Sequence, residues 1–174
     1  TKDTIYIYNF DNLQLLHSIQ TNNNKNGLFK ISIDKHNLIY PDNNKIIIYN
    51  WLDKETKEIE CHVGLIELFT ISNDHTYIAT CSKKGSLIRI FNLDTLELTK
   101  ELRRGTEYVK IVNLSFNKDN SLLLCSSDKG TIHMFSLEDS ISNVNNKTLY
   151  GISYVKSILP KYFDSKWSFS QIYL

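Results

Sequence analysis

Hydrophobic and polar residues alternate with a period of two along most of the chain. Clusters of Val, Ile, Tyr and Phe are bounded by Asn, Asp, Gly and Ser, and no long segment shows a helical period. This pattern predicts an all-antiparallel arrangement of strands with short connections. The predicted strands are residues 4–10, 13–19, 28–33, 36–40, 45–50, 57–61, 65–71, 76–81, 86–92, 97–103, 109–116, 121–126, 131–137 and 167–174.

The predicted strands also repeat in groups. HTYIATCSKKGSLIRIFNL (75–93) parallels NSLLLCSSDKGTIHMFSL (120–137), and HNLIYPDNNKIIIYNW (36–51) is a weaker copy. The period of about 42–45 residues is that of a four-stranded propeller blade. Gly85 and Gly130 supply the positive φ that the hairpin turns of these copies need.

The repeat predicts an all-β fold, a β-propeller of four-stranded antiparallel blades. A blade is stable only when its flat faces stack on neighbours. The sequence accounts for three complete blades and two strands of another, which cannot close a ring, so we expect a partial propeller from a ring of seven blades. The expected divisions are 1–20 (end of one blade), 21–61 (second blade), 62–103 (third blade) and 104–174 (fourth blade, with a long loop at 138–166).

Composition and charge restrict the function. The 174 residues are 41% hydrophobic, and the formal net charge of +1 argues against a duplex nucleic-acid binder. No apolar run approaches the roughly 20 residues of a spanning helix, so we expect a cytoplasmic protein that can sit on a membrane surface. Cys61, Cys81 and Cys125 form no C-x-x-C pair, and the histidines lack metal-ligand spacing. We expect free thiols, no metal and no cofactor.

Two adjacent arginines stand at the end of the predicted strand 97–103, in LRRGT (102–106). Adjacent strand residues point to opposite faces, so Arg103 and Arg104 are predicted to serve two separate anion sites. An arginine fork matches two oxygens of a phosphate monoester at once, and hydroxyls and imidazoles can hold the other oxygens.

Three segments in order carry a family resemblance: LRRGT (102–106), SFNKDNSLLLCSSDKGTIHMFSL (115–137) and ILPKYFDSKWSFSQIYL (158–174). The chain closely resembles the PROPPIN family, the WIPI-like WD-repeat propellers that bind phosphoinositides. The resemblance implies two headgroup sites on the propeller rim, for phosphatidylinositol 3-phosphate or phosphatidylinositol 3,5-bisphosphate. It also implies autophagy proteins as partners, and a peripheral place on autophagosomal, endosomal or vacuolar membranes.

The site residues are carried over position by position. The first site is expected to comprise Arg103, His62, Thr80, Ser82, Ser86 and Arg89. The second site is expected to comprise Arg104, Ser126, Ser127, Thr131 and His133. When the copies are aligned on Phe91 and Phe135, Arg89 and His133 occupy equivalent positions.

The long loop contains LYGISYVKSILPKYF (149–163), which is apolar and aromatic with lysines mixed in. Such a loop is typical of an interfacial membrane element, and the corresponding loop of the family inserts into the bilayer. The expected inserting residues are Tyr154, Ile158, Leu159, Tyr162 and Phe163. The alternative is a loop folded back on its own blade.

No catalytic motif such as G-x-S-x-G, H-E-x-x-H or a phosphate-binding glycine loop is present, so we expect no enzyme activity. The alternative to a lipid-binding protein is a propeller scaffold that binds only proteins, because a propeller fold does not by itself settle function.

Overall fold

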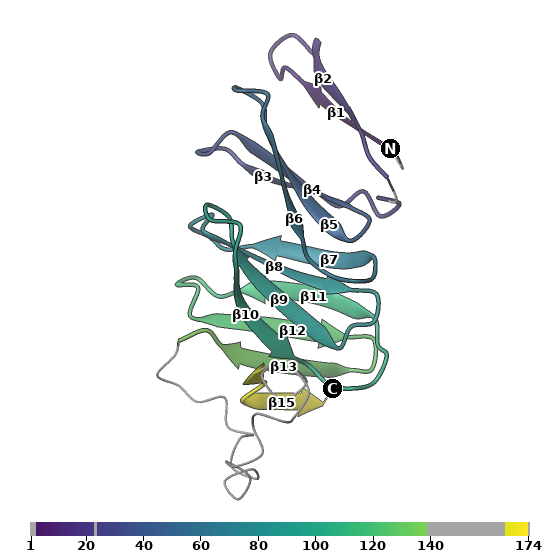
Figure 1. Cartoon of the computed structure of the whole chain (residues 1–174), viewed down its shortest axis with the longest axis vertical. Coiled ribbons are helices and arrows are strands. Elements are labelled where there is room, and N and C mark those ends of the chain that lie inside the picture. The colour runs from purple at the N-terminus through teal and green to yellow at the C-terminus, as the bar shows by residue number, and fades with distance from the viewer. Residues whose placement is uncertain (1–2, 23, 139–165, 174) are drawn as a thin grey trace, which may run out of the picture. The chain divides into compact units, whose positions relative to one another are not determined.

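The computed structural model describes residues 3–22, 24–138 and 166–173, and these form fifteen β-strands (Figure 1). Their bounds are β1 Thr4–Tyr8, β2 Leu15–Gln20, β3 Lys30–Ser32, β4 Asn37–Asp42, β5 Lys45–Asn50, β6 Thr56–Glu60, β7 Ile66–Ile71, β8 Tyr77–Ser82, β9 Leu87–Asn92, β10 Leu98–Arg103, β11 Ile111–Phe116, β12 Leu122–Ser127, β13 Thr131–Ser136, β14 Lys166–Trp167 and β15 Ser170–Tyr173. Among the described residues there is no helix long and apolar enough to cross a bilayer.

The strands form sheets in chain order, within two compact units. In the first unit, Thr1–Ile66, β1 pairs with β2, and β3, β4, β5 and β6 form a four-stranded sheet. In the second unit, Glu67–Leu174, β7 to β10 form one sheet and β11, β12, β13 and β15 form another. Each of the groups β3–β6, β7–β10 and β11, β12, β13 and β15 supplies four antiparallel strands, as a propeller blade does.

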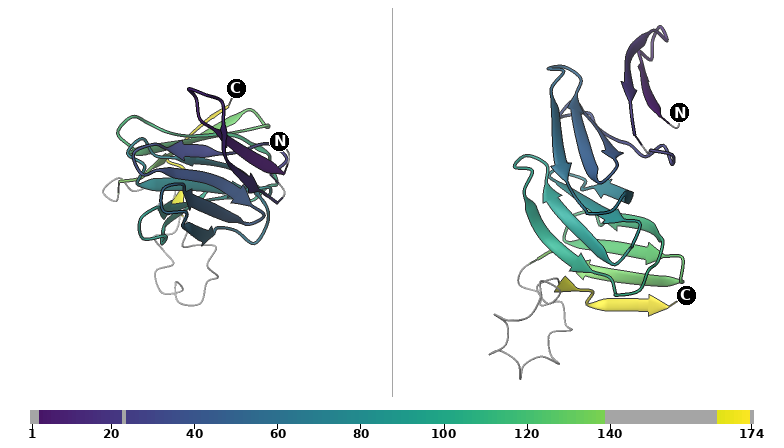
Figure 2. Two further views of the ribbon diagram at one scale, coloured as in Figure 1. Left: turned by 90° about the horizontal axis from the view of Figure 1, so that it is seen from above. Right: turned by 45° about the vertical axis from the view of Figure 1, so that its right-hand side comes forward.

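The last predicted strand, 167–174, is wrong in one respect. It consists of two strands that join different sheets. β14 lies parallel to β10, with Leu102 opposite Lys166, whereas β15 lies antiparallel to β13 (Figure 2). The all-antiparallel prediction therefore fails at β14, because a two-residue strand carries too little pattern to reveal its partner.

The turns that follow β1, β5 and β9 have the same construction. Asn9, Asn50 and Asn92 each accept hydrogen bonds at Oδ1 from main-chain nitrogens two and three residues later. Each turn then ends in a residue with positive φ, namely Leu13, Lys54 or Leu96. Asparagine favours such turns because its side chain mimics a main-chain acceptor. The spacing of these asparagines follows the blade repeat.

The core of the second unit lies between its two sheets. Alternate residues of the first sheet, including Cys81, Ile88 and Leu102, meet Leu123 and Phe135 of the next sheet, and these side chains are fully buried. The opposite faces of these strands are therefore left for other contacts. Arg104 is two residues after the core residue Leu102, so its side chain also points toward the second of these sheets.

Candidate functional site

Arg103 and Arg104 leave β10 toward opposite faces of its sheet. In the register of β10 with β9, Glu101 is opposite Arg89 and Arg103 is opposite Leu87, while Leu102 is opposite the core residue Ile88. Arg103 thus shares a face with Arg89, and Arg104, one residue later, lies on the core side of the sheet. Both arginines are buried, with exposed fractions of 7% and 8%.

Arg104 is held by main-chain acceptors. Its Nε donates to the carbonyl oxygen of Gly85 at 3.0 Å, and its Nη2 donates to that of Glu107. Its own main-chain nitrogen donates to the carbonyl of Ser86 at 3.0 Å. Burial lowers the pKa of the guanidinium, while Cys125, Glu107 and Asp128 act in the opposite direction. The group stays charged, because arginine titrates far above neutral pH.

The turn between β12 and β13 supplies hydroxyls to the side of the second sheet that Arg104 approaches. Ser127 Oγ and Thr131 Oγ1 lie 2.8 Å apart and are hydrogen-bonded to each other. Both residues are buried and share a face with Cys125 and His133, since Cys125 is opposite His133 in the register. The positive charge of Arg104 acts to lower the pKa of the Cys125 thiol, so the face that carries Cys125 lies beside the guanidinium.

His133 is the least satisfied polar group of this cluster. It is only 3% exposed, and its Nδ1 lies 3.1 Å from Ser168 Oγ. Its buried Nε2 has no hydrogen-bond partner among the described residues, and its ring stacks on Phe135 with ring centres 6.4 Å apart. Burial, reinforced by the charge of Arg104, lowers the pKa of His133 to about 4. The imidazole is therefore neutral at pH 7.

Ser126 does not belong with this cluster. It is opposite Ile132 in the register, one residue out of phase with Cys125 and His133, so its side chain lies on the other face of the sheet. The sequence prediction that Ser126 and Ser127 act together ignored this alternation. Of the five residues predicted for the second site, the structure brings together Arg104, Ser127, Thr131 and His133.

Three residues predicted for the first site share the face of Arg103. Thr80 is opposite Arg89, and Ser82 follows Thr80 with the same phase. Thr80 Oγ1 donates to the carbonyl of Arg89 at 3.3 Å, and Arg89 Nε forms an ion pair with Glu101 Oε2 at 2.8 Å. Glu101 is absent from the predicted sites, although its i, i+2 spacing from Arg103 places both residues on this face.

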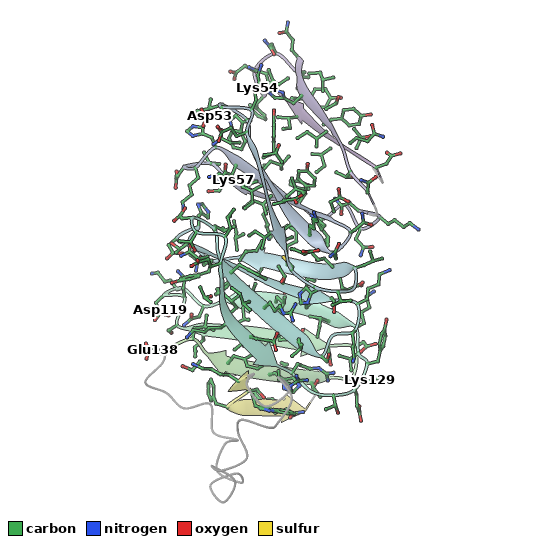
Figure 3. The ribbon with its side chains drawn as sticks, in the orientation of Figure 1. Asp53, Lys54, Lys57, Asp119, Lys129 and Glu138 are labelled. Atoms are coloured by element: carbon green, nitrogen blue, oxygen red, sulfur yellow. The ribbon has the colours of Figure 1, made fainter. Side chains whose placement is uncertain are left out.

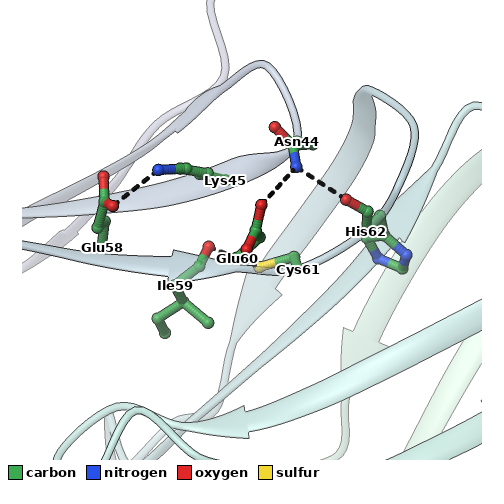
Figure 4. Close-up of polar contacts among 7 residues, drawn as sticks. All are labelled: Asn44, Lys45, Glu58, Ile59, Glu60, Cys61 and His62. Carbon is green, nitrogen blue, oxygen red and sulfur yellow. Dashed lines mark hydrogen bonds and ion pairs between the residues drawn. The ribbon is translucent and has the colours of Figure 1, made fainter.

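The remaining two residues predicted for the first site are placed differently. Ser86 precedes β9 and is out of phase with Leu87 and Arg89, so its side chain lies on the Arg104 side of the sheet. His62 lies in the first unit, where its carbonyl accepts from Asn44 Nδ2 at 3.0 Å (Figure 4). The membership of His62 in the first site stays a prediction.

The two sheets offer equivalent positions at the two faces. Ile78 is opposite Phe91 and Thr80 is opposite Arg89 in one sheet; Leu123 is opposite Phe135 and Cys125 is opposite His133 in the next. Arg89 and His133 therefore occupy the same place in their blades. This is the equivalence that the alignment of the sequence copies on Phe91 and Phe135 predicts.

The end of the strands that carries the arginines is also rich in exposed lysine. Lys83, Lys84, Lys110 and Lys129 are exposed in its turns, against the acidic side chains of Glu107 and Asp128. Figure 3 shows Lys129 at this end and Asp119 and Glu138 at the other end of the second unit. The described residues contain no cluster of His, Cys, Asp or Glu able to hold a metal ion. The chemistry of the arginine end is suited to an anion.

The expected membrane-inserting residues Tyr154, Ile158, Leu159, Tyr162 and Phe163 lie outside the described residues. Ser168, which bonds to His133, was missed by sequence reasoning although its segment carries the resemblance. A lone serine between two short strands gives no periodic signal.

Consecutive groups of four antiparallel strands, with the two sheets of the second unit packed face to face, are typical of a β-propeller. The PROPPIN family model matches residues 1–159. Autophagy-related protein 18e of Arabidopsis thaliana is 32% identical over 180 residues, which cover 99% of this chain and 47% of the relative. The chain belongs to the PROPPIN family.

Other relatives agree. Autophagy-related protein 18 of Dictyostelium discoideum is 35% identical over 144 residues, covering 80% of this chain and 39% of the relative. The structure of Kluyveromyces lactis Hsv2 has the same fold, with a TM-score of 0.76 and 23% identity over 99% of this chain and 52% of that one. A complex of KlAtg21 with the coiled coil of AgAtg16 matches with a TM-score of 0.64 and 26% identity, covering 79% of this chain and 48% of that one. The chain spans about half the length, or less, of the curated relatives it matches.

Proposed function

We propose that the chain binds phosphoinositides and recruits its protein to membranes in autophagy or in endosomal and vacuolar traffic. The ligands are phosphatidylinositol 3-phosphate and phosphatidylinositol 3,5-bisphosphate, recognised through Leu102, Arg103, Arg104 and Gly105. The observation that carries the proposal is the cluster of Arg104 with the hydroxyls of Ser127 and Thr131 and the unbonded Nε2 of His133. A phosphate monoester needs this combination of a fixed cation and several donors.

A second site is proposed on the other face. Arg103, Arg89, Thr80 and Ser82 share that face, and His62 is its proposed further member. Two weak sites on one body bind a membrane jointly through effective concentration, and the aromatic segment 149–163 is proposed to add apolar contact with the lipid. The proposed site of action is the cytoplasmic surface of autophagosomal, endosomal or vacuolar membranes.

Autophagy proteins are the proposed partners. The relative KlAtg21 forms a complex with the coiled coil of AgAtg16, and a coiled-coil segment is the partner type we propose for this chain. The competing function is a scaffold that binds proteins and no lipid. Flotation of the protein with vesicles that contain or lack phosphatidylinositol 3-phosphate distinguishes the two, because a pure scaffold stays with the soluble fraction in both cases.

Each single arginine substitution is expected to weaken vesicle binding without abolishing it. In Arg103→Thr the Arg104 site persists, and in Arg104→Thr the Arg103 site persists, so each variant loses the joint effect of two sites. We expect losses of about tenfold to a hundredfold in apparent affinity, measured by flotation at several lipid fractions. Wild-type affinity in either variant would remove that arginine from the proposal.

Glu101→Gln is expected to strengthen the Arg103 site. The substitution removes the carboxylate that pairs with Arg89 at 2.8 Å, so this negative charge no longer competes with a phosphate for the guanidinium. The pair is partly exposed, so the gain is modest, about twofold to fivefold in affinity for a soluble headgroup. The control is Glu58→Gln, which breaks the Lys45–Glu58 pair at 2.7 Å in the first unit and should change nothing. Weaker binding in Glu101→Gln would show that Glu101 positions Arg89 rather than competing for it.

A further inference from the structure

The unbonded ring nitrogen of His133 distinguishes the Arg104 site from an ordinary cationic patch. The residue is 3% exposed, and within the part of the chain that the structure describes its buried Nε2 has no hydrogen-bond partner. A buried polar atom left without a partner costs free energy, so native structures seldom keep one without a role. Here the atom lies in the cluster that a phosphate is proposed to enter.

The surroundings of His133 determine what this nitrogen can do. The other ring nitrogen, Nδ1, is engaged with Ser168 Oγ at 3.1 Å. The charge that acts on the ring is Arg104, from the segment after β10. From β12 the ring is opposite Cys125, whose thiol stays neutral because burial raises its pKa to about 12, and from β15 it is opposite Gln171. Glu107 and Asp128 act on Arg104.

A positive charge beside the ring favours the tautomer whose lone pair, not its N–H, remains at the unbonded nitrogen. Nδ1–H then donates to Ser168, and Nε2 is an acceptor. An acceptor cannot hold a phosphate oxygen that carries no proton. The nitrogen becomes a donor to the anion only when it is protonated.

We propose that phosphate binding at the Arg104 site is coupled to uptake of one proton by His133. This inference rests on the proposed function. The bound anion offsets the charge of Arg104 and gives Nε2–H an acceptor, so imidazolium is favoured in the complex and disfavoured in the free protein. Nε2 takes its proton from solvent, and no covalent bond to the ligand forms.

The direction of the pH dependence follows from this coupling. In the free protein the pKa of His133 is lowered to about 4 by burial and by Arg104. The anion raises it, and between the two values a full proton uptake increases affinity up to tenfold for each unit by which pH falls. A phosphate monoester itself takes up a proton near pH 6 in solution, which opposes this trend. His133→Gln retains a hydrogen-bonding side chain but cannot titrate, so it measures the opposing term alone.

The test is calorimetric titration with soluble inositol 1,3-bisphosphate at pH 6.5, in two buffers of different ionisation enthalpy. The buffer dependence of the heat gives the number of protons exchanged. We expect wild type to take up at least about half a proton more than His133→Gln per Arg104 site. His75→Asn is the control, because His75 has a φ of 56°, which asparagine tolerates, and should match wild type.

The outcomes separate the two proposals. Equal proton numbers in wild type and His133→Gln, with binding intact, overturn the role of His133 and leave the proposed function standing. Absence of headgroup binding in wild type overturns both. If His133→Gln does not bind, the pKa of His133 is followed by NMR in wild type with and without the headgroup. A ligand-induced rise of the pKa to about 6.5 or higher, which uptake of half a proton at pH 6.5 requires, supports the coupling, and a smaller rise rejects it.

Discussion

Joint conversion of Arg103 and Arg104 to threonine is expected to abolish recruitment to vesicles containing phosphatidylinositol 3-phosphate. The two side chains leave β10 toward opposite faces, so the change removes one guanidinium from each proposed site and leaves only Arg89 in the first. Loss of two jointly acting sites reduces apparent affinity by at least about a hundredfold. Flotation is the measurement, with phosphatidylinositol vesicles as the lipid control.

The control for charge is Lys83→Thr with Lys84→Thr, an exposed dibasic pair in the turn between β8 and β9. It removes the same charge without removing a buried guanidinium, and its effect should be smaller and should fade at high salt. The arginine variant will be less stable, because Gly85 and Glu107 lose a donor to their carbonyls, at a cost of about 1–3 kcal/mol. Full recruitment of a folded double variant would reject the assignment of both arginines.

Gly85→Ala is expected to give a large loss of stability. Gly85 has a φ of +68°, and a Cβ there would stand 2.1 Å from the carbonyl oxygen of Val109. The left-handed conformation alone costs about 1–2 kcal/mol for an L-residue, and the contact with a main-chain atom adds to it. We expect at least about 3 kcal/mol lost from the free energy of unfolding, measured in urea.

Two other glycines separate the causes. Gly27→Ala tests the backbone conformation alone, because Gly27 has a φ of +61° and nothing within 4 Å of a new Cβ. Gly64→Ala is the control for both effects, because open space surrounds a Cβ there and the φ of Gly64 is not positive. The expected order of destabilisation is Gly85, then Gly27, then Gly64. A Gly85 variant as stable as the Gly27 variant would mean that the Val109 segment moves away without cost.

Gly85 also links stability to binding. Its carbonyl accepts from Arg104 Nε, and the turn it closes presents Lys83 and Lys84 at the same end of the sheet. Displacement of this turn shifts the guanidinium, so headgroup affinity at the Arg104 site should fall in the same variant.

The sequence predicted the strands and the divergence of the arginines because both depend on a local period of two. Arg103 and Arg104 differ in face for the same reason that Leu102 and Arg103 do. The same alternation separates Ser126 from Ser127, and it would have excluded Ser126 from the second site. Ser126 was included because it matches the family pattern, without regard to the face of the strand on which it lies.

Contacts between segments far apart in the sequence could not be predicted from the alternation of hydrophobic and polar residues. The Arg89–Glu101 pair depends on the register of β9 with β10, and the Ser168–His133 contact depends on a strand pairing 35 residues away in sequence. The parallel pairing of β14 with β10 rests on two residue pairs. Such features are set by tertiary packing, and propensity alone does not encode them.

The central claim is that each arginine serves its own anion site. Its most direct test is the stoichiometry of soluble inositol 1,3-bisphosphate bound to the folded protein, determined by calorimetry. The two-site arrangement predicts two headgroups bound by wild type, one by Arg103→Thr, one by Arg104→Thr and none by the double variant. A single headgroup bound by wild type and lost in either single variant would show that the two guanidinium groups share one site.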